Sequence, residues 1–184
     1  MSNDLEQARL RRANAFDRAA LAAIYDEYQQ PIYRYIYRNV GEVEIARDLT
    51  AEVFHRFLQA IQREQGPTRH LRAWLYRAAH NSVIDHFRRQ KHRQHLPLNE
   101  ELVNTRDDPV TLAEGRLSAA AVRAALQELT DDQRQVIILK FIEGLSNAEA
   151  ANVLDKPIGA IKSLQHRALA ALQRHLAVPQ QEMW

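Results

Sequence analysis

Residues 144–172 read GLSNAEAANVLDKPIGAIKSLQHRALAAL, and this stretch decides the fold of the C-terminal part of the chain. Ser146 stands at an N-cap position and Glu149 follows three residues later, which is the spacing of a capping box. We therefore predict a short helix over residues 147–154. The Asp-Lys-Pro sequence at 155–157 breaks the pattern, and its proline opens a second, longer helix. A helix, a tight turn and a longer helix form a helix-turn-helix.

The second of these helices, expected over residues 158–176, carries the side chains that can read duplex DNA. In a helix-turn-helix, the N-terminal part of the second helix enters the major groove. The polar candidates share one broad face, and they are Lys162, Ser163, His166 and Arg167. The apolar residues expected to pack inward are Ile161, Leu169 and Leu172. Two helices joined by a turn also occur in helical proteins that bind no nucleic acid, so the motif alone leaves both interpretations open.

The residues before the motif complete a C-terminal domain of four helices. Leu126 and Leu129 lie at the end of one helix, and Thr130 is placed as the N-cap of the next. Residues 133–142 then form a strongly apolar helix whose side chains point in several directions, as expected of a segment enclosed by its neighbours. The expected core residues of this helix are Val136, Ile137, Leu139 and Phe141.

The composition of the 184 residues favours helix and excludes several classes of protein. Ala, Leu, Arg and Gln are frequent, whereas there are only 5 glycines and 6 prolines. Without cysteine the chain has no disulfide and no thiolate zinc site. No apolar run approaches the length of a membrane span, and residues 1–14 are too polar for a signal peptide. We expect a soluble, cytoplasmic, all-α protein without membrane insertion.

Charge divides the chain into two domains. Residues 69–95 hold seven Arg or Lys and a single acid, Asp85, whereas residues 96–115 are acidic and contain two prolines. The acidic segment is expected to be a flexible linker between a domain at 14–95 and a domain at 116–178. The acids of the linker expected to matter are Glu100, Glu101, Asp107 and Asp108.

The N-terminal domain shows the periodicity of four helices. A first helix is expected to stop at Pro31, which starts the next, and that second helix ends at Gly41. A third helix carries apolar residues at steps of four and is ended by the Gly-Pro pair at 66–67. The fourth covers about residues 70–89. The residues it offers to the bundle are Leu71, Trp74, Leu75, Ala78, Val83 and Phe87.

Three stretches resemble the extracytoplasmic-function (ECF) sigma factors of the bacterial sigma-70 family: ARDLTAEVF at 46–54, AWLYRAAHNSVID at 73–85, and residues 129–167. The resemblance implies a region 2 domain, a linker and a region 4 domain in that order. It also implies a dissociable RNA polymerase subunit that directs promoter-specific initiation and is not an enzyme. We expect neither a cofactor nor a metal.

In the family, the third helix docks on the clamp helices of the largest polymerase subunit, and region 4 meets the flap of the second-largest. The implied polymerase-binding residues are Asp48, Leu49, Glu52, Val53, Phe54 and Arg56. Their spacing indicates that Leu49 and Val53 are buried with Phe57, while the three charged residues are exposed. An anti-sigma factor is the further partner that the resemblance implies.

The fourth helix and the loop at 62–70 resemble the family's reader of the minus-ten element, which is bound as a melted single strand. Unpaired bases are held by stacking and by hydrogen bonds to their edges, with cations along the phosphates. The implied residues are Arg77, His80, Asn81, Arg88 and Arg89. The aromatic residues nearby are Trp74, Tyr76 and Phe87, of which Trp74 is expected in the core. Asn81 is the best single candidate for a base contact, and the alternative is that it caps or faces water.

Region 4 would read the minus-thirty-five element as duplex DNA. Two residues depart from the family pattern: Ala160 stands where Thr usually begins the helix, and Leu164 where Arg is common. Both changes are expected to remove polar contacts, each worth about 1–3 kcal/mol.

Two other functions compete with a sigma factor. A helix-turn-helix activator or repressor would bind duplex DNA without polymerase, as a symmetric dimer. An enzyme would need a constellation such as His80, Asp85 and His86, whose spacing does not place them on one helical face. His92 and His95 share a face but make a poor metal site at a frayed helix end.

Overall fold

The computed structural model describes residues 2–94, 125–126 and 128–176, and these residues are helices and their connections without a strand. The chain divides into two compact units, one with helices α1 to α4 and one with α6, η1, most of α7 and α8. The expected linker at 96–115, the part of the expected first C-terminal helix before residue 125 and the tail after residue 176 lie outside the described residues.

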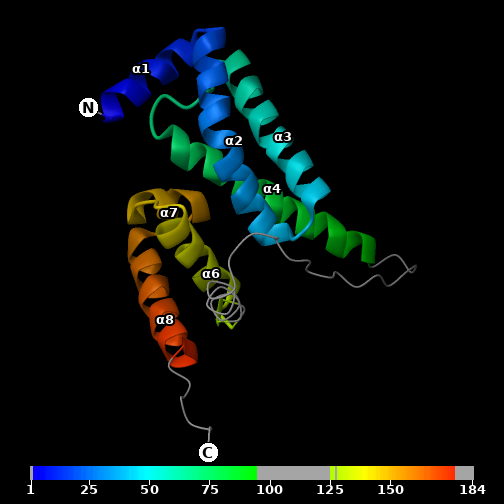
Figure 1. Ribbon diagram of the computed structural model, residues 1–184, viewed down its shortest axis with the longest axis vertical. Coiled ribbons are helices and arrows are strands. Elements are labelled where there is room, and N and C mark those ends of the chain that lie inside the picture. Colours follow the sequence, from blue (N-terminus) through cyan, green and yellow to red (C-terminus); the bar gives the residue numbers. More distant parts are fainter. Residues whose placement is uncertain (1, 95–124, 127, 177–184) are drawn as a thin grey trace, which may run out of the picture. The chain divides into compact units, whose positions relative to one another are not determined.

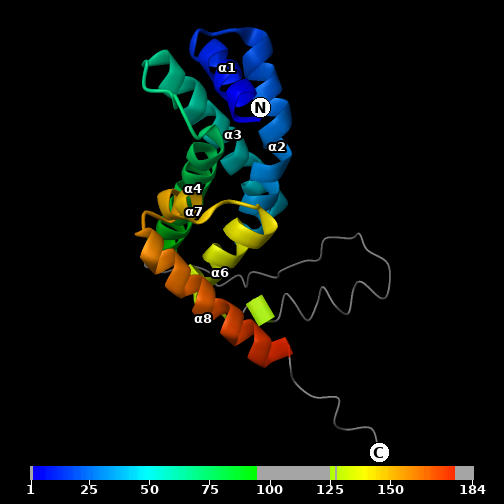
Figure 2. The ribbon, with the colours of Figure 1, turned by 90° about the vertical axis from the view of Figure 1, so that its left-hand side faces the viewer.

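The N-terminal unit is a bundle of three long helices with a shorter fourth helix on one of them. Its helices are α1 (Ser2–Asn14), α2 (Arg18–Val40), α3 (Val43–Gln62) and α4 (Leu71–Gln94). Helices α2, α3 and α4 pack against one another, and α1 packs on α2 (Figures 1 and 2). The largest fully buried side chains of the unit include Ile24, Ile32, Tyr35, Phe57, Leu71, Leu75 and Tyr76.

The expected break at Pro31 is wrong, because α2 continues through the proline as one helix of 23 residues. A proline inside a helix removes one backbone hydrogen bond and crowds the preceding turn. Here the apolar stripe keeps its four-residue period across the proline, with Tyr28 before it and Ile32 and Ile36 after it all buried. Burial of one continuous stripe thus stabilises an unbroken helix. The predicted end at Gly41 is confirmed, with φ 75° and its N–H donating to the Tyr37 carbonyl across 2.8 Å.

Helix α1 was not expected from the sequence, although it buries Leu10 and Ala13. It ends in a Schellman motif, in which Phe16 has φ 59° and donates to Ala13, and Asp17 donates to the carbonyl of Arg12. Asp17 is also the N-cap of α2, where its carboxylate accepts from the N–H groups of Ala19 and Ala20. One tight corner therefore ends α1 and starts α2.

Helix α3 ends at Gln62, four residues before the expected Gly-Pro stop. The end is a second Schellman motif: Gln65 donates to the Ala60 carbonyl across 2.8 Å and Glu64 donates to the Ile61 carbonyl across 3.0 Å. Glu64 occupies the left-handed position, with φ 56°, that glycine usually takes. The sequence lacks the usual signal for this helix end, which explains the error. Helix α4 begins at Leu71, within one residue of the expected start, and continues to Gln94, beyond the expected end near residue 89.

The C-terminal unit contains α6 (Asp131–Ile137), the π-helix η1 (Ile138–Ile142), α7 (Asn147–Leu154) and α8 (Ile158–Leu176). Helix α8 lies against α6 (Figure 1). Their shared core is formed by Leu129, Ile137, Ala168 and Ala171, with Leu126 and Leu172 packed on it. Helices α7 and α8 have the bounds predicted for the two helices of the helix-turn-helix.

Both predicted N-caps of this unit are confirmed as capping boxes. The Ser146 hydroxyl accepts from the N–H of Glu149 across 3.2 Å, and the Glu149 carboxylate accepts from the N–H of Ser146 across 2.8 Å. Thr130 and Gln133 make the same reciprocal pair at the start of α6. Asp155 ends α7 in the left-handed conformation, with φ 52°. Each of the two capping boxes is made by hydrogen bonds between residues three apart, so the local sequence alone specifies it.

The apolar segment at 138–142 differs from the prediction, because it is a π-helix and part of it is exposed. Leu139 and Val136 are fully buried and Ile137 is buried, whereas Phe141 is 55% exposed and Ile142 46%. The expectation that Phe141 belongs to the core is therefore wrong. The wider π turn changes the angle between successive side chains, so a helical period no longer tells which residues face inward.

Candidate nucleic-acid and protein interfaces

The predicted polymerase-binding helix α3 has a buried face and a charged face. Leu49, Val53 and Phe57 are buried, which confirms the expectation for that side. Phe54 is buried as well, and its ring lies edge to face against Tyr25 with the centroids 4.9 Å apart. Tyr25 itself is 48% exposed. Leu49, Val53, Phe54 and Phe57 are buried, so among these aromatic and apolar side chains it is Tyr25 that a partner could touch directly. Tyr25 belongs to α2, so the pattern of the α3 sequence could not indicate it.

The charged face of α3 is formed by three of the predicted residues. Asp48 is exposed, and Glu52 and Arg56 form an ion pair one helical turn apart with both side chains about one third exposed. An ion pair of this kind adds little stability, but it holds two opposite charges in a defined orientation. Such an arrangement can set the register of a protein partner.

Helix α4 presents the predicted single-strand reader. Arg77, Asn81, Arg88 and Arg89 are exposed, and His80 is half-buried. At the C-terminal end, Arg88 pairs with the Asp85 carboxylate across 3.1 Å and Arg89 donates to the Asp85 carbonyl across 3.2 Å. Exposed cations beside an exposed amide match the groups that hold phosphates and base edges.

The half-buried His80 is held by a residue of another helix. The hydroxyl of Tyr35, on α2, lies 3.0 Å from Nδ1 of His80, and the Tyr35 ring packs edge to face against Tyr76. Tyr76 is only 1% exposed and cannot stack on a base. Sequence reasoning assigned Tyr35 no role, since the two partners are 45 residues apart and the helical period marks Tyr35 as core.

The two remaining aromatic residues of α4 are Trp74 and Phe87, and Phe87 is more exposed than expected. Trp74 packs against Phe57 with ring centroids 5.7 Å apart, but it is half-buried and so lies only partly in the expected core. Phe87 was expected to face the bundle but is 43% exposed, with the His86 ring against its edge. It lies on the second half of α4, near the arginines at 88 and 89, where an exposed aromatic ring can stack on a base.

The loop at 63–70 connects α3 to α4 and belongs to the same predicted reader. Most of its side chains are exposed, whereas Pro67 is buried. His70 has φ 53°, and its carbonyl accepts from the N–H of Trp74 across 3.0 Å, so the loop ends in the first turn of α4. The backbone of the loop is thus anchored at several points while its side chains remain accessible.

Helix α8 presents the predicted duplex-reading face. Lys162, Ser163, His166 and Arg167 are all exposed, so the structure brings these four residues to one accessible surface. The Ser163 hydroxyl donates to the Gly159 carbonyl across 3.0 Å, which leaves its oxygen able to accept from a base or a backbone group.

The inward face of α8 differs from the prediction at two positions. Ile161 is fully buried, but Leu169 is 37% exposed and Leu164 is buried. Leu164 is thus not on the exposed face, and the expectation that it removes a polar DNA contact stays a prediction. Ala160 is half-buried at the start of the helix.

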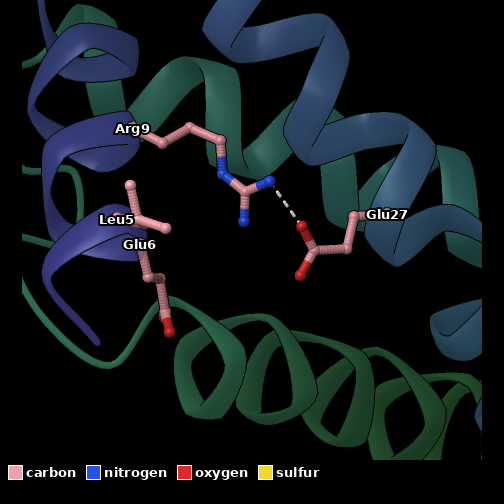
Figure 3. A pocket seen from close by; sticks show the side chains of 4 residues that line it. All are labelled: Leu5, Glu6, Arg9 and Glu27. Carbon is pink, nitrogen blue, oxygen red and sulfur yellow. Dashed lines mark ion pairs between the residues drawn. The ribbon is translucent and has the colours of Figure 1, made fainter. Parts of the chain in front are cut away.

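The described residues contain little that suggests another chemistry. A hollow of about 400 Å³ between α1 and α2 is lined by Leu5, Glu6, Arg9 and Glu27, and it contains none of the predicted site residues (Figure 3). Within the described ranges no three His, Cys, Asp or Glu residues gather as metal ligands would. Among the helices described, none is long and apolar enough to cross a membrane.

Comparison with solved structures supports the fold. CnrH, in complex with the cytosolic domain of CnrY, aligns with a TM-score of 0.69 and 23% identity over 93% of this chain and 96% of that chain. The sigma factor RpoE of Bartonella quintana, in complex with the anti-sigma factor NepR, aligns with a TM-score of 0.67 and 23% identity over 86% of this chain and 98% of that chain.

Comparison of sequences identifies the family. The family model for sigma-70 region 2 matches residues 24–93, and the model for sigma-70 region 4 matches residues 119–172. The ECF sigma factor BldN of Streptomyces coelicolor is 39% identical over 90% of this chain, which spans 63% of BldN. SigX and SigW of Bacillus subtilis, also ECF sigma factors, are each 32% identical, with 85% and 95% of their lengths covered. With both regions in the family's order and with SigX and SigW covered over 85% and 95% of their lengths, the chain belongs to the ECF RNA polymerase sigma factors.

Proposed function

We propose that this chain directs bacterial core RNA polymerase to particular promoters. The N-terminal unit binds the clamp helices through α3 and holds the minus-ten element as a melted strand through α4 and the loop at 63–70. The C-terminal unit binds the minus-thirty-five element as duplex through α8 and meets the flap. The protein is then a cytoplasmic specificity subunit and the polymerase supplies the catalysis.

One observation carries this proposal: the two units expose different chemistry. On α4, an amide and a half-buried imidazole lie among arginines, which suits bases that have left the duplex. On α8, the exposed polar residues follow a tight turn at the start of the second helix of a helix-turn-helix, which suits the major groove. A regulator that binds only duplex DNA would have no use for the first surface.

In-vitro transcription from a genomic library tests the proposal. Bacterial core polymerase is used with and without the protein, and start sites are mapped. Start sites that share two upstream motifs and appear only with the protein support the proposal. No new start sites, together with tight binding of the protein alone to duplex DNA, would replace it with the activator or repressor.

We also propose that an anti-sigma factor covers these surfaces. The solved structure of the Bartonella quintana RpoE in complex with the anti-sigma factor NepR supports such a partner for this fold. Pull-down of the protein with core polymerase, in competition with a candidate antagonist, tests this: a true antagonist displaces the core enzyme.

The acidic linker has a proposed role of its own. The linker would run through the polymerase, and its negative charge would resemble that of a nucleic acid. The acids concerned are Glu100, Glu101, Asp107 and Asp108. Replacing all four with neutral amides should impair initiation or promoter escape in a run-off assay while both domains stay folded. Unchanged initiation and escape would refute this role.

A further inference from the structure

The end of α1 is joined to the loop between α3 and α4. Asn14, the last residue of α1, donates a hydrogen bond from Nδ2 to the carbonyl oxygen of Pro67 across 3.0 Å. These residues are 53 positions apart, and the region 2 family match begins only at residue 24. The contact therefore ties a helix outside that match to the loop at 63–70.

Gly66 makes the close approach possible. A Cβ atom on residue 66 would overlap with Oδ1 of Asn14 and would lie 3.0 Å from Cγ1 of Ile61. Its φ is outside the left-handed region, so glycine is needed here for space rather than for its backbone torsion. The loop and the Asn14 side chain are thus fitted to each other at two adjacent residues, 66 and 67.

The direction of the Asn14 side chain is set by the corner between α1 and α2. The Schellman motif at Phe16 turns the chain directly after Asn14. Arg12 donates from Nε to the Asp17 carboxylate across 2.7 Å and so braces the corner on its outer side. A side chain that leaves such a corner has little freedom, and its hydrogen bond can restrain the loop it reaches.

We propose that Asn14 is a positioning residue that holds the loop at 63–70 in the conformation that captures an unstacked minus-ten base. Asn14 itself does not touch the DNA but acts through the loop. The Schellman motif at the end of α3 restrains one end of the loop, and the first turn of α4 restrains the other. Asn14 holds the middle of the loop through its hydrogen bond to Pro67. The inference rests on the proposed function, because it requires the loop to read a melted strand. It makes α1 part of the melting apparatus.

The first test uses the holoenzyme and a promoter found in the transcription experiment, with 2-aminopurine at successive minus-ten positions of the non-template strand. Asn14→Asp keeps the shape of the side chain but replaces the donor with an acceptor, and Asn14→Ala removes both. Gln7→Ala, which truncates an amide two turns earlier on α1, is the matched control. We expect both Asn14 variants to lower the rate of the position-specific fluorescence rise about three- to tenfold, as for one lost hydrogen bond. Affinity for core polymerase should equal that of Gln7→Ala.

A wild-type rate in both Asn14 variants would overturn the inference alone. Wild-type holoenzyme without a position-specific rise would overturn the proposed function, and the inference with it. Hydrogen exchange of the free protein separates positioning from general damage. Faster exchange confined to residues 63–70 supports the inference, whereas faster exchange throughout α3 and α4 contradicts it.

The second test exploits the overlap at residue 66. Gly66→Ala should reproduce the defect, because its Cβ displaces the Asn14 side chain. In the double variant Asn14→Ala with Gly66→Ala, the overlapping oxygen is gone, so the defect should be no greater than that of Asn14→Ala alone. Two defects that multiply would show that the residues act independently and would overturn the inference.

Discussion

The Tyr35 hydroxyl lies 3.0 Å from Nδ1 of His80, and this contact joins the centre of α2 to the predicted DNA face of α4. Tyr35 is fully buried, so it cannot take part in binding itself. Its hydroxyl orients the imidazole, and the orientation decides which ring nitrogen is presented outward. A core residue is thereby linked to the surface that we propose reads the melted strand.

Tyr35→Phe should slow promoter melting while the protein stays folded. The phenylalanine ring can keep the edge-to-face packing on Tyr76, and only the hydroxyl is lost. We expect a loss of about 1 kcal/mol in the free energy of unfolding. We also expect slower open-complex formation, similar in size to that of His80→Ala. Normal melting by Tyr35→Phe beside a defective His80→Ala would show that the hydroxyl does not orient His80.

Asn81→Ala should reduce recognition of the minus-ten element and leave stability unchanged, since the side chain is exposed. Binding of holoenzyme to single-stranded non-template oligonucleotides, each with one abasic minus-ten position, measures the effect. The variant should lose the preference at one position, by about 1–3 kcal/mol if the amide pairs with a base edge. A uniform loss at all positions would indicate a phosphate contact or no base contact.

The α8 face should give a salt-dependent contribution to promoter binding. Lys162→Ala and Arg167→Ala each remove an exposed cation. Each lost phosphate contact should lower the slope of log affinity against log salt by about 0.9. Gln173→Ala, exposed on the same helix, is the control. Filter binding of holoenzyme to a duplex promoter at several salt concentrations measures the slopes, and unchanged slopes would place the DNA elsewhere.

Ser146→Ala should destabilise the C-terminal unit by about 1 kcal/mol, because one half of the capping box is lost. Ser146→Thr keeps a hydroxyl acceptor and should restore most of the stability. Urea unfolding followed by circular dichroism measures the difference. Equal stability of the alanine and threonine variants would mean that the cap contributes little here.

The corner between α1 and α2 should become weaker in acid. The hydrogen bond from Arg12, followed by the N–H of Ala20, holds the pKa of Asp17 below its usual value. A carboxyl whose pKa is lower in the folded state contributes stability that is present above its unfolded pKa and is lost as the pH falls through the folded value. Unfolding measured from about pH 6 down to about pH 3 should therefore show a steeper decline for wild type than for Asp17→Asn. Parallel curves would exclude this contribution.

The sequence by itself determined the elements that depend on neighbours in the chain. Capping boxes at Thr130 and Ser146 and the glycine end at Gly41 are made by residues a few positions apart, so their boundaries were predictable. The exposed quartet on α8 follows from the helical period alone. For these residues, the spacing along the chain is enough to predict the local structure.

Only the tertiary structure decided the features that depend on distant packing. Burial of the stripe on both sides of Pro31 outweighs the lost hydrogen bond and keeps α2 whole. The π turn exposes Phe141 against its hydrophobicity. Tyr35 meets His80, and Asn14 meets Pro67, across 45 and 53 residues. No local pattern specifies such contacts, because they arise when helices that form independently are packed together.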